Sequence, residues 1–196
     1  MKLLGIIGSP RRGGNTEIIV REALKAAEEG GASTELIFLT DFGLGPCDGC
    51  RTCFDTKDCV VEDDVEKIYG KMAKADGVII GSPVYFNNVT AQTKTFIDRV
   101  GYLNIARGRK ALRNKVGGAI VVGRRAGLSY AYDQILMFFS GMRMITANPA
   151  VGALASAKGE VMKDTEGVDA ARELGRSMVQ IAKATALMRE NLPNRD

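Results

Sequence analysis

Four cysteines, the chain's whole complement, lie close together between residues 46 and 60. Cys47, Cys50, Cys53 and Cys59 follow the spacing C-x2-C-x2-C-x5-C. Three thiolates in one short loop can bind one face of a cubane cluster, and a fourth a few residues later can complete its coordination. A zinc site more often uses two separated C-x2-C pairs, and this chain has no second pair at a distance. The spacing therefore favours an iron–sulfur cluster held by four thiolates.

Three other interpretations of the cysteines stay open. They are a structural zinc knuckle, two disulfides, and a redox dithiol accompanied by two incidental cysteines. Disulfide frameworks are typical of secreted chains, whose signal peptides carry an apolar run of ~7 to 15 residues. The apolar run at this N-terminus, LLGIIG, is shorter and ends in GSPRR. We therefore expect a cytoplasmic protein.

The composition bounds the fold and excludes several mechanisms. The chain has 196 residues, of which 45% are hydrophobic, and this suits one well-buried domain spanning residues 1–196. It has no histidine, so Ser-His-Asp triads, Cys-His dyads and histidine-ligated metal sites cannot form. The net charge of +4 comes from interspersed signs and does not indicate nucleic-acid binding. No apolar run approaches the ~20 residues that a membrane span needs.

Short apolar runs alternate with amphipathic segments along the chain. Strands are expected at residues 3–8, 34–39, 77–83, 116–123 and about 143–146. Helices are expected at residues 15–29, from about 63, from about 90 to 102, up to about 139, and at 168–189. This alternation predicts an α/β fold, a doubly wound five-stranded parallel sheet with helices on both faces. Ligands of such sheets bind at the carboxyl ends of the strands, and the cysteine loop, at about 43–62, follows the second strand.

The loop after the first strand, GSPRRGGNT, leads into a helix and is suited to binding a phosphate. Free backbone N–H groups and the positive end of the helix dipole would meet the phosphate, and polar side chains would add donors. The candidate residues are Ser9, Arg11 or its neighbour Arg12, Gly14, Asn15 and Thr16. The loop has neither the G-K-[ST] of a P-loop nor the G-x-G-x-x-G of a Rossmann site, which disfavours both functions.

Two further strand-end loops supply groups that suit a flat heterocycle. Such a ring system needs apolar or aromatic surface against its faces and a few amide or backbone groups at its polar edge. The loop after the third strand offers Pro83, Val84, Tyr85, Phe86, Asn87 and Asn88. Its aromatic residues have a competing interpretation as the core of a packed turn. The loop at 123–127 adds Gly123, Arg124 and Gly127, with arginines that could face a ring carbonyl, a phosphate or water.

Taken together, GSPRRGGNT, CDGCRTC with its fourth cysteine, and GSPVYFNNVTAQTKTFIDR resemble the iron–sulfur flavoproteins. These proteins are a branch of the flavodoxin-like NADPH-dependent FMN reductase superfamily, and the likeness extends to about residue 125. The resemblance implies one FMN and one 4Fe-4S cluster per subunit of a homo-oligomer, a dimer or a tetramer. In a tetramer of this family a cluster lies close to the flavin of a neighbouring subunit.

The resemblance also assigns residues to the flavin. Ser9, Arg11, Asn15 and Thr16 would hold the FMN phosphate, residues 83–88 would line the isoalloxazine, and residues 123–127 would flank its far side. The last loop departs from the glycine-richer form expected of the family.

The implied function is electron transfer between a ferredoxin-like one-electron donor, the cluster, FMN and a downstream acceptor. One alternative is an NAD(P)H-dependent reductase of flavin, quinone or metal ions. There the basic run at 107–115 would receive a 2′-phosphate or an acidic partner, unless it is only a solvated surface loop. Another alternative, of a different class, is a zinc-containing nucleotide-binding module. None of these schemes assigns a catalytic side chain.

Overall fold

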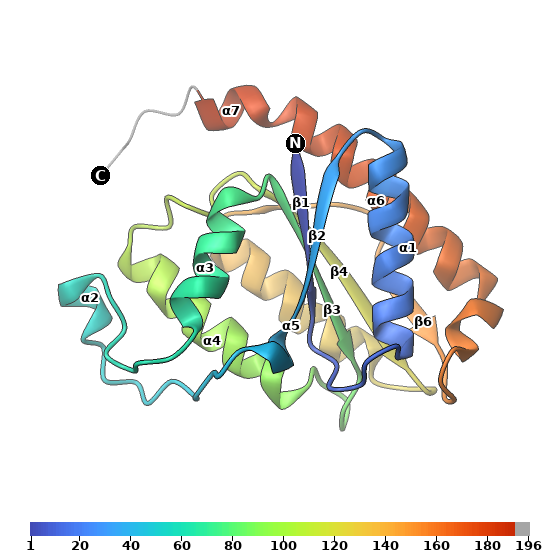
Figure 1. Cartoon of the computed structure of the whole chain (residues 1–196), viewed down its shortest axis with the longest axis horizontal. Helices are drawn as coiled ribbons and strands as arrows, with labels where there is room; N and C mark the ends of the chain where they lie inside the picture. Colours follow the sequence, from blue (N-terminus) through green and yellow to red (C-terminus); the bar gives the residue numbers. More distant parts are fainter. Residues whose placement is uncertain (191–196) are drawn as a thin grey trace.

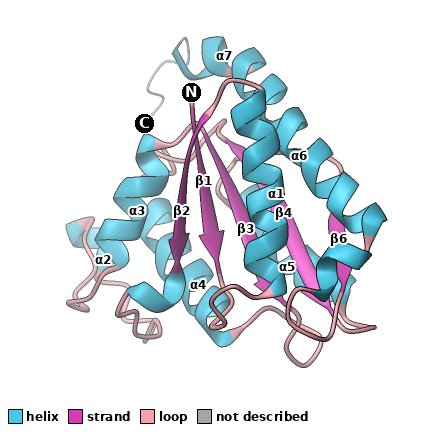
Figure 2. Cartoon of the chain, turned by 45° about the vertical axis from the view of Figure 1, so that its right-hand side comes forward, coloured by secondary structure: helices cyan, strands magenta, loops and turns pink. Residues whose placement is uncertain are grey.

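A parallel sheet lies at the centre of the computed structural model, which describes residues 1–190 (Figure 1). Its strands are β1 (Lys2–Ile7), β2 (Ser33–Phe38), β3 (Gly77–Pro83), β4 (Val116–Gly123), β5 (Ile145–Thr146) and β6 (Val151–Leu154). Every pairing is parallel, and the order is β2-β1-β3-β4-β5 with β6 also beside β4. This is the flavodoxin-like strand order, which confirms the predicted fold class. Figure 2 shows the longer strands ending at one edge, where loops gather.

Helices cover both faces of the sheet. One face carries α1 (Asn15–Glu29) and α6 (Thr165–Ala184), and the other carries α3 (Val65–Lys74), α4 (Ala91–Ala106) and α5 (Leu128–Gly141). The short elements are η1 (Leu39–Asp41), α2 (Cys53–Thr56), η2 (Glu160–Lys163) and α7 (Ala186–Glu190). Within residues 1–190, no helix combines the length and the apolar character needed to cross a bilayer.

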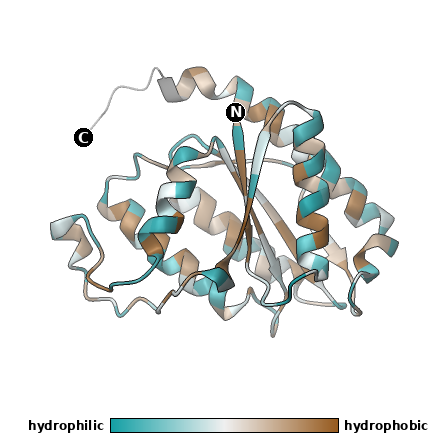
Figure 3. Cartoon of the chain, viewed as in Figure 1, coloured by the Kyte–Doolittle hydropathy of each residue, from teal (hydrophilic) through white to brown (hydrophobic). Residues whose placement is uncertain are grey.

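The sequence of β1 explains the two-sided core. Side chains alternate across a strand, so Leu4 and Ile6 enter the core beneath α3, α4 and α5, while Leu3 and Ile7 enter the core beneath α1 and α6. All four are completely buried. A strand that is covered on both faces reads as a continuous apolar run, and Figure 3 shows this hydrophobic centre between helices of mixed hydropathy.

The region after α5 differs from the prediction. The expected strand at about 143–146 is only the two residues of β5, and the four-residue strand β6 was not predicted. The two strands share one position in the sheet, with β5 beside the start of β4 and β6 beside its end. Pro149 lies in the interruption between them, and proline has no N–H for a strand ladder. The last long helix starts at Thr165, because the Asp164 carboxylate accepts the Gly167 N–H at 3.0 Å, and it ends at Ala184.

Candidate functional site

Loops at the carboxyl edge of the sheet enclose a cavity of about 210 Å³. Ten predicted residues line it, namely Ser9, Arg11, Gly14, Asn15, Thr16, Pro83, Val84, Tyr85, Gly123 and Arg124. Three residues that were not predicted complete the lining, namely Val122, Ala155 and Ser156. The predicted Phe86, Asn87, Asn88 and Gly127 do not line the cavity. The structure therefore brings the three predicted loops together and adds a fourth.

The predicted residues that do not line the cavity lie in or against a tight turn at its rim. Tyr85 and Asn88 pair through two backbone hydrogen bonds, of 2.8 and 3.0 Å, and Phe86 and Asn87 form the tip with φ angles of 46° and 61°. Phe86 is fully exposed and Tyr85 is 44% exposed, so the interpretation of these aromatics as core residues is wrong. Gly127 has φ +83°, and a Cβ there would lie 2.7 Å from the Asn87 Cα. Gly127 thus packs the third loop against this turn.

A buried hydroxyl network fixes the first two loops relative to each other. The Thr90 hydroxyl donates to the Gly8 carbonyl at 2.7 Å and lies 2.9 Å from the Thr93 hydroxyl. The Thr90 N–H donates to Ser82 Oγ at 3.2 Å. Thr90 is the N-cap of α4 and Thr93 lies in its first turn, and both are completely buried. The signal in the sequence is the spacing T-x-x-T at a helix start, where a threonine hydroxyl can cap the helix.

The fourth loop follows β6 and is joined to the first by Asn15. The Asn15 amide donates to the Ala157 carbonyl at 2.8 Å and accepts from the Val161 N–H at 3.4 Å. Asn15 is the first residue of α1 and does not cap it, since the N-cap is Gly14, without a side-chain bond. Lys158 places its Nζ 3.1 Å from the position that a Cβ on Gly13 would take. These contacts were missed because β6 was not predicted.

The two arginines of the first loop have different environments. Arg11 lines the cavity. The Arg12 guanidinium stacks 3.6 Å from the centroid of the Phe38 ring and pairs with Asp41. Of the two arginines, Arg11 is therefore the one that faces the cavity.

Glu17 is a buried carboxylate in the first turn of α1. It accepts the Gly13 N–H at 2.6 Å and Arg21 Nε at 2.9 Å. Burial alone would raise the pKa of Glu17, but these two hydrogen bonds and the nearby charges of Arg21 and Arg12 outweigh it and lower the pKa. Glu17 is therefore ionised when it binds the N–H of the first loop.

We expect Glu17→Gln to weaken the fall of the free energy of unfolding as the pH is lowered. The pKa is lowered on folding, so the wild-type contribution is complete above about 4.5, the ordinary value, and is lost as the pH falls through the folded pKa. Urea unfolding at pH 7 and at a series of lower pH values measures this. The variant should be less stable at pH 7, and the difference should shrink on acidification. A difference that stays constant with pH would contradict this role.

The cysteine loop surrounds a second cavity, of about 240 Å³, which all four cysteines line. The four are free thiols, with Cys47 and Cys50 exposed and Cys53 and Cys59 half-buried. The remaining wall is mainly apolar and includes Phe54, Val60, Val61, Tyr102 and Leu103. Within residues 1–190, no three cysteine or acidic side chains converge on a point as ligands of a single metal ion. The thiols surround a space instead.

A buried arginine, missed in the sequence, forms the inner wall of this cavity. Arg99 extends from α4, its side chain is 1% exposed, and it forms an ion pair of 2.6 Å with Asp63. It also donates to the Gly45 carbonyl at 2.6 Å and to Cys59 Sγ at 3.3 Å. Burial would raise the pKa of Asp63, but hydrogen bonds from Arg99, Val65 N–H and Gly45 N–H lower it. Asp63 was expected in the first turn of α3, which instead begins at Val65.

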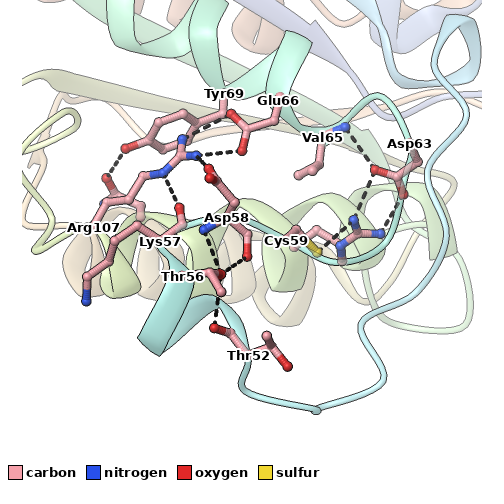
Figure 4. Close-up of polar contacts among 12 residues, drawn as sticks. Thr52, Thr56, Lys57, Asp58, Cys59, Asp63, Val65, Glu66, Tyr69 and Arg107 are labelled. Carbon is pink, nitrogen blue, oxygen red and sulfur yellow. Dashed lines mark hydrogen bonds and ion pairs between the residues drawn. The ribbon is translucent and has the colours of Figure 1, made fainter.

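A second arginine anchors the end of the cysteine loop (Figure 4). Arg107 bonds both oxygens of Glu66, at 2.7 and 3.0 Å, and the Lys57 carbonyl at 2.7 Å, and it lies 4.9 Å from the centroid of the Tyr69 ring. Two more members of the basic run also bond within the chain, since Arg109 reaches the Gly141 carbonyl and Lys115 reaches the Ala73 carbonyl. Much of the basic run thus holds the fold together.

The two cavities share no lining residue. The cysteine loop leaves the carboxyl end of β2, as predicted, but then passes along α4, and α2 lies beside the α3 and α4 layer, well away from β6 (Figure 1). Helix α4 connects the two sites, because Thr93 supports the first and Arg99 lines the second. At 1.5 Å per residue these positions are about 9 Å apart along the helix axis. The expectation that both sites share the strand-end face therefore holds only for the start of the loop.

Comparison with known proteins agrees with this architecture. The cavity-bearing part of the chain, residues 1–159, matches the family model of the NADPH-dependent FMN reductases. Among solved structures, RosB with bound 8-demethyl-8-formylriboflavin-5′-phosphate superposes with a TM-score of 0.78 at 19% identity, covering 96% of this chain and 81% of RosB. An archaeal flavodoxin superposes with a TM-score of 0.65 at 15% identity, covering 93% of this chain and 99% of the flavodoxin. At these identities the two structures support the fold alone.

Sequence relatives narrow the family further. An iron–sulfur flavoprotein of Methanocaldococcus jannaschii is 44% identical over 192 residues, covering 93% of this chain and 98% of the relative. The iron–sulfur flavoprotein of Methanosarcina thermophila is 37% identical over 185 residues, covering 92% and 95% of the two chains. These matches make the chain an FMN-dependent oxidoreductase. It belongs to the iron–sulfur flavoproteins of the NADPH-dependent FMN reductase family.

Proposed function

We propose that this protein transfers electrons through one FMN in the strand-edge cavity and one 4Fe-4S cluster in the cysteine cavity. The observation that carries the proposal is the second cavity, because all four cysteines of the chain line it as free thiols. The names of the relatives, iron–sulfur flavoproteins, support the same cofactor pair. When bound, the cluster supplies single-electron transfer and the flavin supplies one- or two-electron chemistry.

The strand-edge cavity fits FMN in its shape and its donor groups. The start of α1 supplies backbone N–H groups and the hydroxyls of Ser9 and Thr16 for a phosphate, and the guanidinium of Arg11 adds charge. Pro83 and Val84 supply apolar wall for the isoalloxazine. In this proposal Asn15 holds the fourth loop in place, while residues 86–88 and Gly127 shape the rim.

The cysteine cavity fits a four-thiolate cluster better than it fits a single ion. Cys47, Cys50, Cys53 and Cys59 would be the ligands, and apolar side chains with one buried cation surround them. Cys47 and Cys50 are exposed, so one side of the cluster would lie near solvent, where an electron donor can approach. We propose a ferredoxin-like donor and a cytoplasmic homo-oligomer, a dimer or tetramer. The two cavities lie on different parts of one chain. An oligomer that places the cluster of one subunit beside the flavin of a neighbouring subunit would shorten the distance over which electrons are transferred.

A second candidate function is an NAD(P)H-dependent reductase of flavin, quinone or metal ions. It is favoured by the matched family, the NADPH-dependent FMN reductases. Anaerobic stopped-flow mixing with NADPH separates the two functions. Slow or absent bleaching of the flavin is expected of the electron carrier, and bleaching within milliseconds would favour the reductase.

The cofactor content tests the proposal directly. Protein purified without oxygen should contain about four irons, four sulfides and one FMN per chain. Metal and acid-labile sulfide analysis, together with the flavin spectrum, gives these values. One zinc per chain with no flavin absorbance would overturn the proposal in favour of a zinc-containing nucleotide-binding module.

Arg11→Ala tests the assigned phosphate site. Losing a charge-assisted hydrogen bond costs about 1.5–3 kcal/mol, so FMN should bind roughly 10- to 100-fold more weakly. Riboflavin, which has no phosphate, should bind the variant and the wild type equally. Flavin fluorescence titration of the apoprotein measures both ligands. Arg12→Ala is the matched control, because Arg12 stacks on Phe38 and pairs with Asp41. An equal loss of FMN affinity in both variants would count against the assignment.

A further inference from the structure

The contact between Arg99 and Cys59 is not explained by the ligand set alone. Arg99 Nη2 lies 3.3 Å from the sulfur, and its side chain is almost completely buried. The guanidinium is planar and permanently charged, and it presents donors in fixed directions. A positively charged donor held this close to a ligand sulfur stabilises negative charge on that sulfur.

The position of the guanidinium is overdetermined. Asp63 accepts from it with both carboxylate oxygens, at 2.6 and 3.0 Å, and Gly45 accepts with its carbonyl at 2.6 Å. Gly45 precedes the first cysteine and Asp63 follows the last, so one side chain of α4 joins both ends of the cysteine loop. The Asp63 carboxylate also accepts the Gly45 N–H at 3.0 Å, which closes the base of the loop. The loop therefore has a fixed base before any cofactor binds.

Exposed and buried charges near the cysteines differ in how strongly they act on the sulfurs. Asp48, Asp55 and Asp58 are exposed, and water and salt screen such charges strongly. Arg99 is buried, so its field at the neighbouring sulfur is screened much less. Asp63 neutralises the pair as a whole, but the guanidinium is the end that contacts Cys59. The local effect at this ligand is therefore that of a hydrogen-bond donor.

We propose that Arg99 is a positioning residue that presets Cys59 for cluster binding and raises the reduction potential of the cluster. This inference rests on the proposed function. Reduction would add one electron from the external donor without making or breaking a bond, and the Cys59 thiolate would carry part of the added negative charge. An N–H donor at Cys59 stabilises that charge more in the reduced state than in the oxidised state. Asp63 and Gly45 keep the donor in place.

Anaerobic redox titration of the reconstituted protein with dithionite, followed by electron paramagnetic resonance, tests the inference. Arg99→Gln should lower the reduced-to-oxidised ratio at a fixed potential about tenfold, which is a midpoint ~59 mV more negative for a one-electron couple. Asp63→Asn should shift the midpoint the opposite way, because the asparagine carbonyl and the Gly45 carbonyl still accept from the guanidinium while the charge that offsets Arg99 is removed. Arg107→Gln is the matched control. Arg107 is an arginine anchor of the same loop that bonds Glu66, the Asp58 carboxylate and the Lys57 carbonyl, and within residues 1–190 it makes no bond to a sulfur.

The outcomes separate this inference from the proposed function. A wild type without iron would defeat the proposed function. Wild-type iron in Arg99→Gln with an unchanged midpoint would overturn the inference alone. If Arg99→Gln fails to hold iron, Asp63→Asn decides: a positive shift supports the inference, and an unchanged or more negative midpoint overturns it. An equal shift in Arg107→Gln would reduce the effect to general loop charge and also overturn it.

Discussion

Cys50→Ala is expected to remove the cluster and leave the flavin in place. A four-thiolate site would lose one of its four ligands, and alanine has no group that can bind iron. Iron should fall from about four per chain to a small fraction of one after anaerobic purification. FMN should stay near one per chain, because the two cavities share no lining residue. Iron analysis and the visible spectrum measure both cofactors.

The control for this variant is Thr52→Ala. Thr52 lies in the same loop between two cysteines, and its contacts in the loop run through its backbone carbonyl, which accepts from Asp55 and Thr56. Its iron content should match that of the wild type. Full iron in Cys50→Ala would remove Cys50 from the ligand set. A parallel loss of FMN would instead mean that the two sites depend on each other, against the geometry described above.

The fold followed from the sequence where local pattern and tertiary environment agree. The strand β1 is apolar throughout because both faces of the sheet are covered, and the glycine-rich turn after it leads directly into α1. The end of the chain was harder. β6 has only four residues and is defined by pairing with β4, a contact distant in sequence that no local pattern encodes.

The sites divided in the same way. Motif residues such as Ser9, Thr16 and Pro83 were found because a loop between a strand and a helix has a readable composition. Arg99 and Asp63 were missed because an arginine in α4 and an aspartate before α3 meet only in the folded chain. Arg99 shares the buried face of α4 with Phe96 and Leu103, but only the folded chain shows that Asp63 and Gly45 meet its charge there.

Gly175→Ala is expected to destabilise the protein, although alanine is the better helix former. Gly175 lies within α6 where that helix packs on α1, and a Cβ there would lie 2.0 Å from the Ala23 carbonyl oxygen. The helix gains about 1 kcal/mol from alanine, but the clash is with backbone, so the two helices must separate at an overpacking cost of about 3 kcal/mol. We therefore expect a net loss of about 2 kcal/mol. Thermal unfolding should show a Tm lower by roughly 4–8 °C.

Gly70→Ala provides the matched comparison, because Gly70 also lies inside a helix but has open space around it. A Cβ at Gly70 would meet nothing within 4 Å, so only the intrinsic preference for alanine remains. This variant should gain up to about 1 kcal/mol and raise the Tm by roughly 2–4 °C. Opposite signs for the same substitution would show that backbone contact, not helix propensity, requires glycine at residue 175. A gain at both positions would mean that α1 and α6 separate at little cost, and that their close packing contributes little to stability.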